Sequence, residues 1–331
     1  MNKFINRFKL LSDYIQKNPE SSGYPLELVI EATNHCNLNC IMCLRQNMKR
    51  KIGYMSMKLY KKIVNETANY LELLYLHGEG EPLFHPKIFE MVKYAKQKGL
   101  SVGISTNATI LTKEKSKKLL ESGLDYLIIA LDATTAKTYK KVRGGNNFNQ
   151  VKKNVRDYLR LKNKASHSPF TVIQFVKMAE NEKEEKKFRS MWQNSGAEVV
   201  RVKPVIDLLR ESQEKGKLPH RPCFYIWRQL NFISWDGRLV TACCMDAEGD
   251  YPLGNVNQRT IAEIWNGKPM VALREAHTSG RWRKMPFCQN CTFPQPSLPG
   301  RVGAMILPGD LVKKILPFLE KITLGNFQVY D

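Results

Sequence analysis

LELVIEATNHCNLNCIMC, the sequence of residues 26–43, joins a short apolar run to three closely spaced cysteines. The run over 26–32 is aliphatic and β-branched and predicts a buried strand. Cys36, Cys40 and Cys43 follow it with the spacing C-x3-C-x2-C. Three thiolates leave a tetrahedral zinc site one ligand short, whereas in a [4Fe-4S] cluster they leave one iron open for a small chelating ligand. The stretch therefore predicts a metal centre beside a strand end, with a zinc loop or buried structural thiols as the alternative.

Apolar runs and segments of helical period alternate after this first strand. The predicted strands cover 26–32, 71–77, 100–106, 125–132, 170–176 and 198–204, and the predicted helices cover 56–70, 86–98, 112–122, 148–162 and 180–195. Such alternation predicts an α/β fold of parallel strands joined by right-handed crossovers. The unit closes into a full or partial β/α barrel, or opens as a doubly wound sheet. In both cases ligands bind at the carboxyl ends of the strands.

Residues suited to ligand binding follow several of the predicted strands. The stretch Gly78-Glu79-Gly80-Glu81-Pro82 comes after the second strand, Thr106 and Asn107 follow the third, and Asp132 ends the fourth. Glycines allow close approach of the backbone, and carboxylates accept strong hydrogen bonds from an amino group. These residues and the cysteine loop therefore predict one site at the carboxyl edge of the sheet. The alternative for the acidic stretch is a turn that opens a helix at Pro86.

The composition excludes several classes of protein. The chain has 331 residues, 43% of them hydrophobic, which suffices for a sizeable core and is too apolar for a disordered or fibrous chain. It has no run of about 18 apolar residues and no export signal at its start, so we expect no transmembrane segment and a cytoplasmic location. The cytoplasm keeps thiols reduced, so the eight cysteines are expected to be metal ligands or catalytic groups.

The chain is strongly basic, with 52 lysines and arginines against 31 acidic residues and a net charge of +21. One alternative is therefore a basic nucleic-acid-binding protein with structural metal sites. The lysines are spread along predicted helix surfaces, as at 113–118, and no nucleic-acid motif accompanies them, which favours a solvated basic face without a stable nucleic-acid partner. Such a charge would also attract an anionic substrate, and the basic N-terminal segment 1–24 leaves a peripheral membrane contact open.

A second group of cysteines begins about 180 residues after the first and comprises Cys223, Cys243, Cys244, Cys288 and Cys291. It contains one C-x2-C pair, whereas a zinc ribbon normally uses two, so zinc is the weaker alternative. The charged segment 211–221 suits a linker. We therefore predict four parts: an N-terminal basic segment (1–24), a core domain (25–210), a second cysteine-bearing domain (211–300) and a tail with one amphipathic helix (301–331).

At the three-cysteine loop and the Gly-Glu-Gly-Glu-Pro stretch, the sequence resembles the radical S-adenosylmethionine (SAM) superfamily. The resemblance implies a partial (β/α)6 TIM-like barrel and a SAM-binding [4Fe-4S] cluster held by Cys36, Cys40 and Cys43. In this family the methionine end of SAM chelates the open iron. Electron transfer into the sulfonium then yields a 5′-deoxyadenosyl radical that takes a hydrogen atom from the substrate. The resemblance also implies an external electron donor such as flavodoxin or ferredoxin.

The same resemblance implies roles for residues around SAM. The motif that receives the methionine amino group corresponds to Gly78, Glu79, Gly80 and Glu81, with the Glu81 carboxylate as acceptor. Thr106, Asn107 and Asp132 correspond to strand-end positions of the cofactor pocket, and Arg143 would pair with the SAM carboxylate. A helix cap or a solvated surface residue is the alternative for Asp132 and Arg143. Where the family commonly has Thr-Asn-Gly, this chain has Ala108, which matters only if the backbone there needs a positive φ.

The second cysteine group resembles the C-terminal auxiliary-cluster extensions of this superfamily, called SPASM when long and twitch when short. The resemblance implies a small auxiliary iron-sulfur domain with one auxiliary [4Fe-4S] cluster. Its ligands would be Cys223, Cys243, Cys288 and Cys291, with Cys244 as the alternative to Cys243. Four cysteines leave no open iron for substrate, which favours electron transfer as the role of this cluster.

The four-cysteine arrangement resembles family members that oxidise a sugar-like secondary alcohol. We therefore expect a radical SAM oxidoreductase that acts on a sugar-like or other small-molecule alcohol and uses the auxiliary cluster as electron acceptor. The main alternative is a maturase that crosslinks or epimerises a ribosomal peptide. No general base is assigned, although Lys203, Asp207 and Tyr225 lie where the core passes into the second domain.

Overall fold

The computed structural model describes residues 2–205, 222–243, 245–285, 287–288, 291 and 298–307. Within these residues the strands form one eight-stranded sheet in the order β6-β5-β4-β3-β2-β1-β7-β8. The strands are β1 (Glu27–Ile30), β2 (Leu73–Tyr75), β3 (Ser101–Thr106), β4 (Tyr126–Ala130), β5 (Phe170–Lys177), β6 (Val199–Pro204), β7 (Gln229–Ile233) and β8 (Val240–Thr241). Neighbours from β6 to β7 pair in parallel, and β8 pairs antiparallel with β7.

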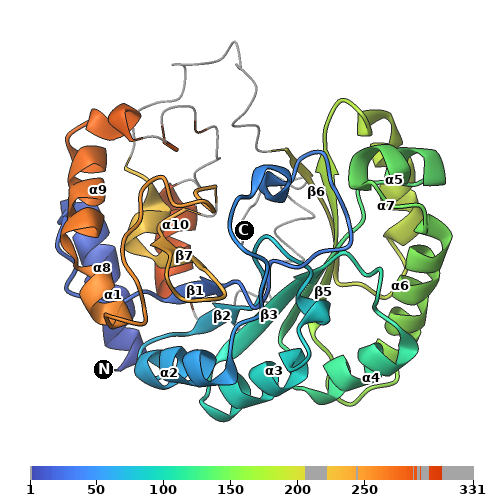
Figure 1. Cartoon of the computed structure of the whole chain (residues 1–331), viewed down its shortest axis with the longest axis horizontal. Helices are drawn as coiled ribbons and strands as arrows, with labels where there is room; N and C mark the ends of the chain where they lie inside the picture. Colours follow the sequence, from blue (N-terminus) through green and yellow to red (C-terminus); the bar gives the residue numbers. More distant parts are fainter. Residues whose placement is uncertain are drawn as a thin grey trace.

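Strands β1 to β6 lie side by side in chain order, so the chain winds in one direction. A doubly wound sheet would instead reverse its strand order at a switch point. Helices cover the convex side of this sheet (Figure 1). They are α2 (Met57–Thr67), α3 (Ile88–Gln97), α4 (Lys113–Glu121), α5 (Ala136–Arg143), α6 (Phe148–Lys162) and α7 (Glu185–Trp192). The predicted α/β fold is confirmed, and it is the partial TIM-like barrel rather than the doubly wound sheet.

Side-chain alternation along β5 separates the core from the concave face of the sheet. Ile173 and Phe175 are buried, and the Phe175 ring packs on Phe188 of α7 with 4.8 Å between centroids. Gln174, between them, must point to the opposite, concave face because successive side chains of a strand alternate. It is paired in register with Arg201 of β6. The concave wall of the half-barrel therefore carries polar groups between the two outer strands.

In the part of the chain that precedes β6, three α-helices differ from the sequence-based expectation. The N-terminal segment contains a helix that was not predicted, α1 (Lys3–Gln16), and α5 fills part of a stretch without a predicted element. The helix predicted over 180–195 begins only at Glu185, after a 3-10 turn over Glu182–Glu184. The reason is Asn181, whose side chain accepts from the Met178 N–H (2.8 Å) and donates to the Asp132 carbonyl (3.0 Å), which holds a turn there.

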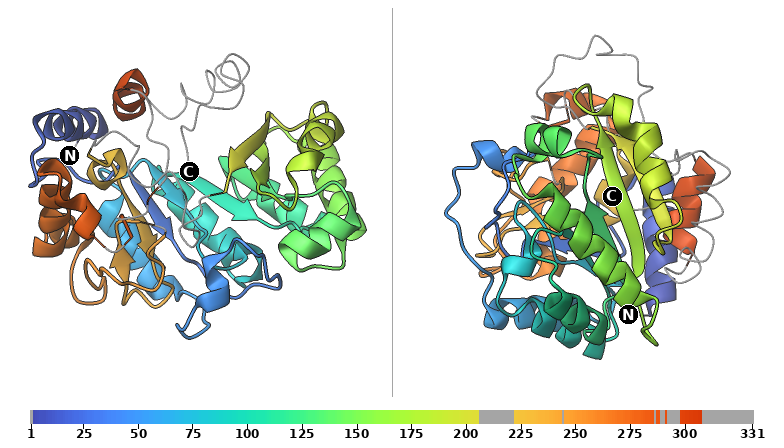
Figure 2. Two further views of the ribbon diagram at one scale, coloured as in Figure 1. Left: turned by 90° about the horizontal axis from the view of Figure 1, so that it is seen from above. Right: turned by 90° about the vertical axis from the view of Figure 1, so that its right-hand side faces the viewer.

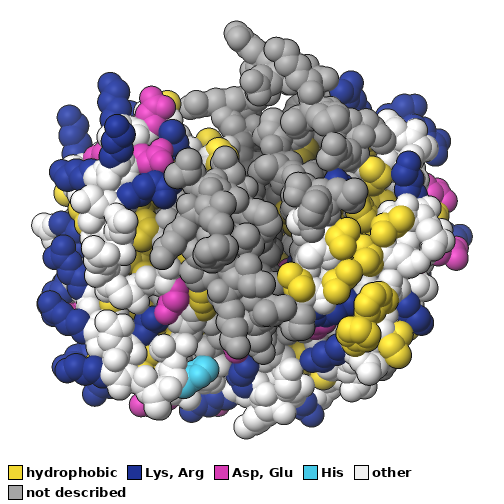
Figure 3. Space-filling model, turned by 180° about the vertical axis from the view of Figure 1, so that it is seen from behind, with side chains coloured by type: hydrophobic (Ala, Val, Ile, Leu, Met, Phe, Trp, Pro, Cys, Tyr) yellow, Lys and Arg dark blue, Asp and Glu magenta, His cyan; other side chains and the backbone are white. Residues whose placement is uncertain are grey.

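The second cysteine-bearing unit continues the same sheet, because β7 pairs with β1 on its free side. Its helices are α8 (Ile261–Trp265), α9 (Lys268–Thr278) and α10 (Leu298–Ile306). Helix α10 packs against α1 at one edge of the molecule (Figure 2). Hydrophobic side chains gather on that side in the view from behind (Figure 3).

Some sequence-based predictions lie beyond what the structure describes. The predicted linker, Asp207 and the predicted tail helix fall outside the described residues. The boundaries 1–24, 25–210, 211–300 and 301–331 therefore stay predictions. Among the described helices, none has the length and apolar character needed to cross a bilayer.

The junction of β1 and β7 contains a buried ion pair. Arg228 donates through Nη2 to Glu27 Oε1 at 2.7 Å, and both side chains are about 6% exposed. Truncating one partner would leave the other as an uncompensated buried charge, which typically costs several kcal/mol. We therefore expect Glu27→Ala to lower the free energy of unfolding by about 3 kcal/mol in anaerobic urea titrations.

A surface pair provides the control for this prediction. Glu114 and Lys118 are 2.6 Å apart on α4 and remain largely exposed. Glu114→Ala should change the free energy of unfolding by less than about 0.5 kcal/mol. Equal effects of the two substitutions would show that the β1–β7 junction does not depend on the buried pair.

Candidate functional site

Two loops meet at the carboxyl ends of β1 and β2. The Glu81 N–H donates to the His35 carbonyl at 2.9 Å, which joins the acidic stretch to the cysteine loop. A methyl group on Gly80 would overlap the Thr33 carbonyl oxygen, and one on Gly78 would lie 2.9 Å from Cβ of Glu31. Both glycines are therefore required by close backbone approach, as their sequence context predicted.

The three cysteines of the loop have three different polar neighbours. Asn107 Nδ2 lies 3.7 Å from Cys36 Sγ, Arg143 Nη1 lies 3.4 Å from Cys40 Sγ, and Cys43 Sγ lies 3.6 Å from Glu79 Oε2. These contacts bring the ends of β2 and β3 and the last turn of α5 against the cysteine loop. The sequence-predicted residues Asn107, Glu79 and Arg143 are therefore gathered around the predicted cluster ligands.

Burial disfavours the thiolate form of two of these cysteines, Cys36 and Cys43. It raises the pKa of the Cys36 thiol, and it raises the pKa of Cys43 to about 12, with the Glu79 carboxylate as a further cause. Without a bound cation these two thiols stay protonated at neutral pH. Since the thiolate is the form that binds metal, cluster binding must release protons here.

Glu81 occupies the centre of the strand-end network and is fully buried. One carboxylate oxygen accepts from Thr106 Oγ1 at 2.7 Å and from the Leu83 N–H at 3.1 Å, and the other accepts from the Asn107 N–H at 2.7 Å. Both oxygens are thus already bound by the protein. The geometry favours Glu81 as the group that ties the ends of β2 and β3 together, while Glu79 directs its carboxylate at the cysteine loop. The predicted role of Glu81 as acceptor for SAM stays a prediction.

Burial also changes the protonation of Glu79. It raises the pKa of this carboxyl to about 7, with the nearby Glu31 carboxylate as a second cause. The group can therefore carry or lose its proton near neutral pH beside Cys43.

Asp132 and Arg143 form a buried ion pair behind the cysteine loop, with 2.8 Å between Asp132 Oδ2 and Arg143 Nη2. Asp132 also accepts from the Val176 N–H of β5 at 2.6 Å. The alternative of a solvated surface position is therefore wrong for both residues. Arg143 Nε is buried and has no hydrogen-bond partner among the described residues, so one donor remains for an anionic ligand such as a carboxylate.

Two residues of this edge have left-handed backbone. Ala108 has φ 59° and Asp132 has φ 57°. The family commonly has a glycine at the position of Ala108, and this replacement does matter here because the backbone adopts a positive φ. For a residue other than glycine this conformation costs roughly 1–2 kcal/mol, and such strain gathers at functional sites.

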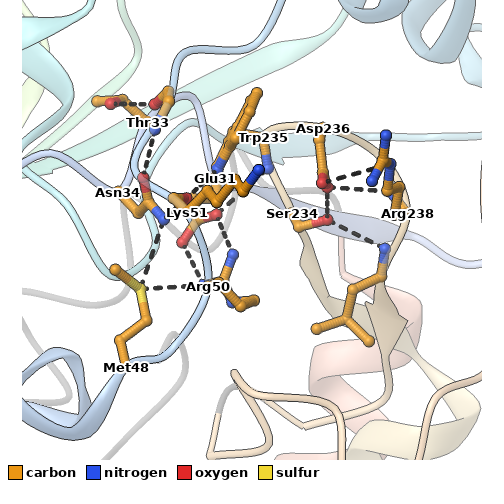
Figure 4. A network of polar contacts seen from close by, with 12 residues as sticks. Glu31, Thr33, Asn34, Met48, Arg50, Lys51, Ser234, Trp235, Asp236 and Arg238 are labelled. Carbon is orange, nitrogen blue, oxygen red and sulfur yellow. Dashed lines mark hydrogen bonds and ion pairs between the residues drawn. The ribbon is translucent and has the colours of Figure 1, made fainter.

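A polar network that the sequence did not reveal connects this edge to the β7–β8 turn (Figure 4). Arg50 donates to both carboxylate oxygens of Glu31 at 2.8 Å, and the Trp235 backbone N–H donates to the same carboxylate at 3.2 Å. The Trp235 indole donates to the Lys51 carbonyl at 3.0 Å. A cavity of about 770 Å³ lies beside the network, lined in part by Arg50, Trp235 and Arg238. Glu31 was not singled out from the sequence; a glutamate at the end of an apolar strand is the signal that could have indicated the network.

The structure also brings cysteines of the second group together. Burial raises the pKa of the Cys288 thiol, and the neighbouring Cys223 and Cys291 raise it further. His277 links two of them: its Nε2 lies 3.4 Å from Cys288 Sγ, and its Nδ1 accepts from the Cys223 N–H at 3.3 Å. His277 was not singled out from the sequence. Cys244 lies outside the described residues, so the choice between it and Cys243 stays open.

Cysteine thiolates are the usual ligands of iron-sulfur clusters, and each of the two cysteine groups supplies at least three of them. In the described part of the chain, no group of three or more Cys, His, Asp and Glu side chains is arranged to hold a metal ion. A cubane distributes its cysteine ligands over separate irons, so the thiols need not converge on one point. Two cysteine groups of this kind on one sheet define a class of protein, an iron-sulfur enzyme with a half-barrel core.

Comparison with known proteins identifies the family. A model of the radical SAM superfamily matches residues 30–188, and a model of the SPASM iron-sulfur cluster-binding domain matches residues 223–292. The two matches together cover more than half of the chain. The chain belongs to the radical SAM superfamily and carries a C-terminal SPASM-type domain. It is therefore a radical SAM enzyme, and its domains imply SAM, a SAM-binding [4Fe-4S] cluster and an auxiliary cluster.

Several relatives and solved structures are similar to the chain. The tungsten-containing aldehyde ferredoxin oxidoreductase cofactor-modifying protein of Pyrococcus furiosus is 27% identical over 80% of this chain and 87% of its own. A mycofactocin maturase of Mycobacterium tuberculosis is 33% identical over 38% of this chain and 32% of its own. Among structures, BtrN in complex with AdoMet and 2-DOIA has a TM-score of 0.55 and 18% identity, covering 81% of this chain and 93% of BtrN. Streptococcus suis SuiB has a TM-score of 0.64 and 14% identity, covering 81% and 71%. At these identities the structures support the fold alone.

The Gly80 contact generates a first prediction at the site. In Gly80→Ala the added methyl would push the acidic stretch away from the cysteine loop, and a displacement of about 1 Å can cost about 100-fold in rate. We expect 5′-deoxyadenosine formation from SAM under reducing conditions to fall by about that factor. The control is Gly303→Ala in α10, where a methyl would meet its nearest atom at 3.7 Å. Unchanged cleavage in Gly80→Ala would exclude this contact as a requirement.

The two glutamates of the acidic stretch generate a second prediction. In Glu81→Gln the amide can accept on one side only, so at least one buried N–H loses its partner. The free energy of unfolding should then fall by about 2 kcal/mol. Glu79→Gln should leave the free energy of unfolding unchanged within about 0.5 kcal/mol. Burial already disfavours the charged form of this carboxyl, so a neutral amide of the same shape replaces it at little cost. Anaerobic urea titration of both variants measures the difference, and the reverse order of effects would contradict the assignment of Glu81 to the strand-end network.

Proposed function

We propose that this enzyme oxidises an alcohol group of a small, polar, sugar-like molecule, with the auxiliary cluster as electron acceptor. The observation that carries the proposal is the pairing of a three-cysteine loop at the carboxyl end of β1 with a four-cysteine set in the adjoining unit. A fully ligated cluster suits electron transfer, and an alcohol oxidation by hydrogen-atom removal must dispose of one further electron and one proton. A relative whose name describes cofactor modification supports a small-molecule substrate.

Cys36, Cys40 and Cys43 would hold the first cluster, and SAM would lie against it. When bound, these groups supply a 5′-deoxyadenosyl radical that takes a hydrogen atom from the substrate. The chain's own residues position that chemistry: Glu81 fixes the ends of β2 and β3, and Arg143 Nε offers its remaining donor to the SAM carboxylate. Asp132 keeps the Arg143 guanidinium in place.

The concave face supports a hydroxyl-bearing substrate. The Gln174 side-chain carbonyl is buried and has no hydrogen-bond partner among the described residues. In the sheet, Gln174 of β5 is in register with Ala130 of β4 on one side and with Arg201 of β6 on the other. A substrate hydroxyl could donate to this acceptor, and the net charge of +21 suits a substrate with partial or full negative charge.

The topology supports an electron-transfer role for the auxiliary ligands. Cys223 precedes β7, and Cys243 follows β8, which runs antiparallel to β7, so both lie toward the amino end of β7. The first cysteine loop follows the carboxyl end of β1, which is parallel to β7. The two ligand sets are thus placed toward opposite ends of paired strands. An external donor such as flavodoxin or ferredoxin would supply the reducing electron.

A ribosomal-peptide maturase is the second candidate function. Its support is the match to mycofactocin maturases and the likeness to SuiB, which has been solved with its precursor peptide SuiA. That match covers about a third of each protein, which leaves the small-molecule oxidation as the first candidate.

Iron analysis tests the two-cluster arrangement. Anaerobically reconstituted wild type should contain about eight irons per chain, and both Cys36→Ala/Cys40→Ala/Cys43→Ala and Cys223→Ala/Cys288→Ala should contain about four. The first variant should lose the SAM-dependent change in the EPR spectrum, whereas the second should keep it and still form 5′-deoxyadenosine. Zinc in place of iron would contradict the proposal.

Deuterium transfer tests the reaction itself. Wild type is incubated with SAM, reductant and a panel of sugar and cyclitol alcohols deuterated at the carbinol carbon. We expect one deuterium in 5′-deoxyadenosine for each ketone formed, and no ketone from Cys223→Ala/Cys288→Ala. A crosslinked or epimerised peptide product, without ketone formation from any alcohol, would favour the maturase instead.

A further inference from the structure

Helix α1 is fixed to the body of the protein through its polar residues. Asn6 donates to the Tyr24 carbonyl at 2.9 Å and accepts from the Tyr24 N–H at 2.7 Å. Arg7 is paired with Glu72 and donates to the Ile306 carbonyl of α10 at 2.7 Å. Asp13 accepts from the Ser22 N–H at 2.7 Å. These contacts hold the helix in one orientation.

The opposite face of α1 is apolar and exposed. Phe4 is 61% exposed, Ile5 50%, Phe8 44% and Ile15 60%, and these are four of the seven large hydrophobic side chains exposed in the described residues. Phe4, Phe8 and Ile15 project within about 40° of one another on an ideal helix. The rings of Phe4 and Phe8 touch edge to face, with 4.7 Å between centroids. The usual amphipathic arrangement is therefore inverted, with the buried face largely polar and the outer face apolar.

This surface lies at the edge where α1 and α10 pack together (Figure 2), and hydrophobic side chains gather on that side in Figure 3. An exposed apolar patch on a helix that is fixed to the body of the protein is typical of a binding surface, whereas a loosely attached helix could expose apolar residues without a function. Because the polar contacts above fix its orientation, the helix cannot turn its aromatic residues inward without breaking them.

Basic residues flank the exposed apolar face of α1, which forms a stripe along the helix, and their charge indicates what kind of partner binds there. The helix carries Lys3 and Lys9, and Lys17 follows it, whereas its one acidic residue, Asp13, is buried. Lys3 also reaches the Gly99 carbonyl, which places the exposed Lys98 near the same end. An apolar stripe with basic neighbours matches the boundary of an anionic bilayer. A second copy of the chain would bring lysine against lysine on a protein of net charge +21, which disfavours self-association.

We propose that the outer face of α1, defined by Phe4, Ile5, Phe8 and Ile15, docks the enzyme onto the surface of a membrane rich in anionic lipid. The helix would lie flat in the interface, with its aromatic rings among the acyl chains and its lysines at the headgroups. The attachment is peripheral and independent of the reaction at the carboxyl edge of the sheet.

Flotation of the anaerobic holoenzyme with vesicles tests this proposal. The wild type should float with phosphatidylcholine vesicles that contain phosphatidylglycerol and much less with pure phosphatidylcholine, and high salt should weaken the binding. Phe4→Ser/Phe8→Ser should lower the partition coefficient by about tenfold or more. Lys9→Gln should lower it by about fivefold. The matched control is Ile52→Ser, since Ile52 is 56% exposed but lies outside α1.

Each outcome supports or overturns the proposal. The substituted side chains are exposed, so iron content and far-UV circular dichroism should be unchanged and a folding defect can be recognised. Absence of vesicle binding by the wild type, equal binding by Phe4→Ser/Phe8→Ser, or equal losses in Ile52→Ser would overturn it. Salt-insensitive binding to both vesicle types would overturn the anionic-lipid assignment. Sedimentation velocity without lipid completes the test: a dimer that Phe4→Ser/Phe8→Ser abolishes would make a second copy the partner instead.

Discussion

The close approach of the Gly80 backbone to the Thr33 carbonyl is the constraint on which the site depends. It lets the loop after β2 lie directly on the loop after β1, and the Glu81 N–H then bonds to the His35 carbonyl. Once the loops are in contact, the buried Glu81 carboxylate gathers donors from the end of β3 as well. Three strand ends are thus held in one arrangement by backbone proximity and a single carboxylate. The cysteine loop is held on one side by that arrangement and on the other by the end of α5, where the Arg143 and Val142 carbonyls accept from the Asn39 and Ile41 N–H groups at 3.2 and 3.0 Å.

Strand β1 links this edge to the second unit at both of its ends. At its amino end Glu27 pairs with Arg228, next to the start of β7, and at its carboxyl end Glu31 holds Arg50 and the Trp235 N–H. Since both glutamates are buried, displacement of β7 would expose or unpair charges at either end, which is costly. The SPASM-type unit is therefore a continuation of the barrel wall.

Local sequence signals accounted for the six parallel strands, the glycine contacts and the cluster loops, because apolar periodicity and close cysteine spacing are properties of neighbouring residues. The features that escaped prediction are long-range. Arg50 pairs with Glu31 across a loop. His277 contacts Cys223, 54 residues earlier, and Cys288, 11 residues later. Strand β7 pairs with β1, which lies about 200 residues earlier in the chain. Helix α1 was not predicted for another reason. Its buried face is largely polar and its apolar face is exposed, which is the reverse of the pattern by which an amphipathic surface helix is recognised in a sequence.

The three thiols of the first loop lie in unequal electrostatic surroundings. Cys40 is beside the Arg143 guanidinium, Cys43 beside the Glu79 carboxyl and Cys36 beside a neutral amide. Burial and the Glu79 carboxylate raise the pKa of the Cys43 thiol, because a nearby carboxylate disfavours the thiolate. Asp132 reinforces the asymmetry by fixing Arg143 on the side of Cys40. The three cysteines of one loop are thus distinguished by their polar neighbours, which come from α5, from the β2 loop and from the end of β3 rather than from the cysteine motif itself.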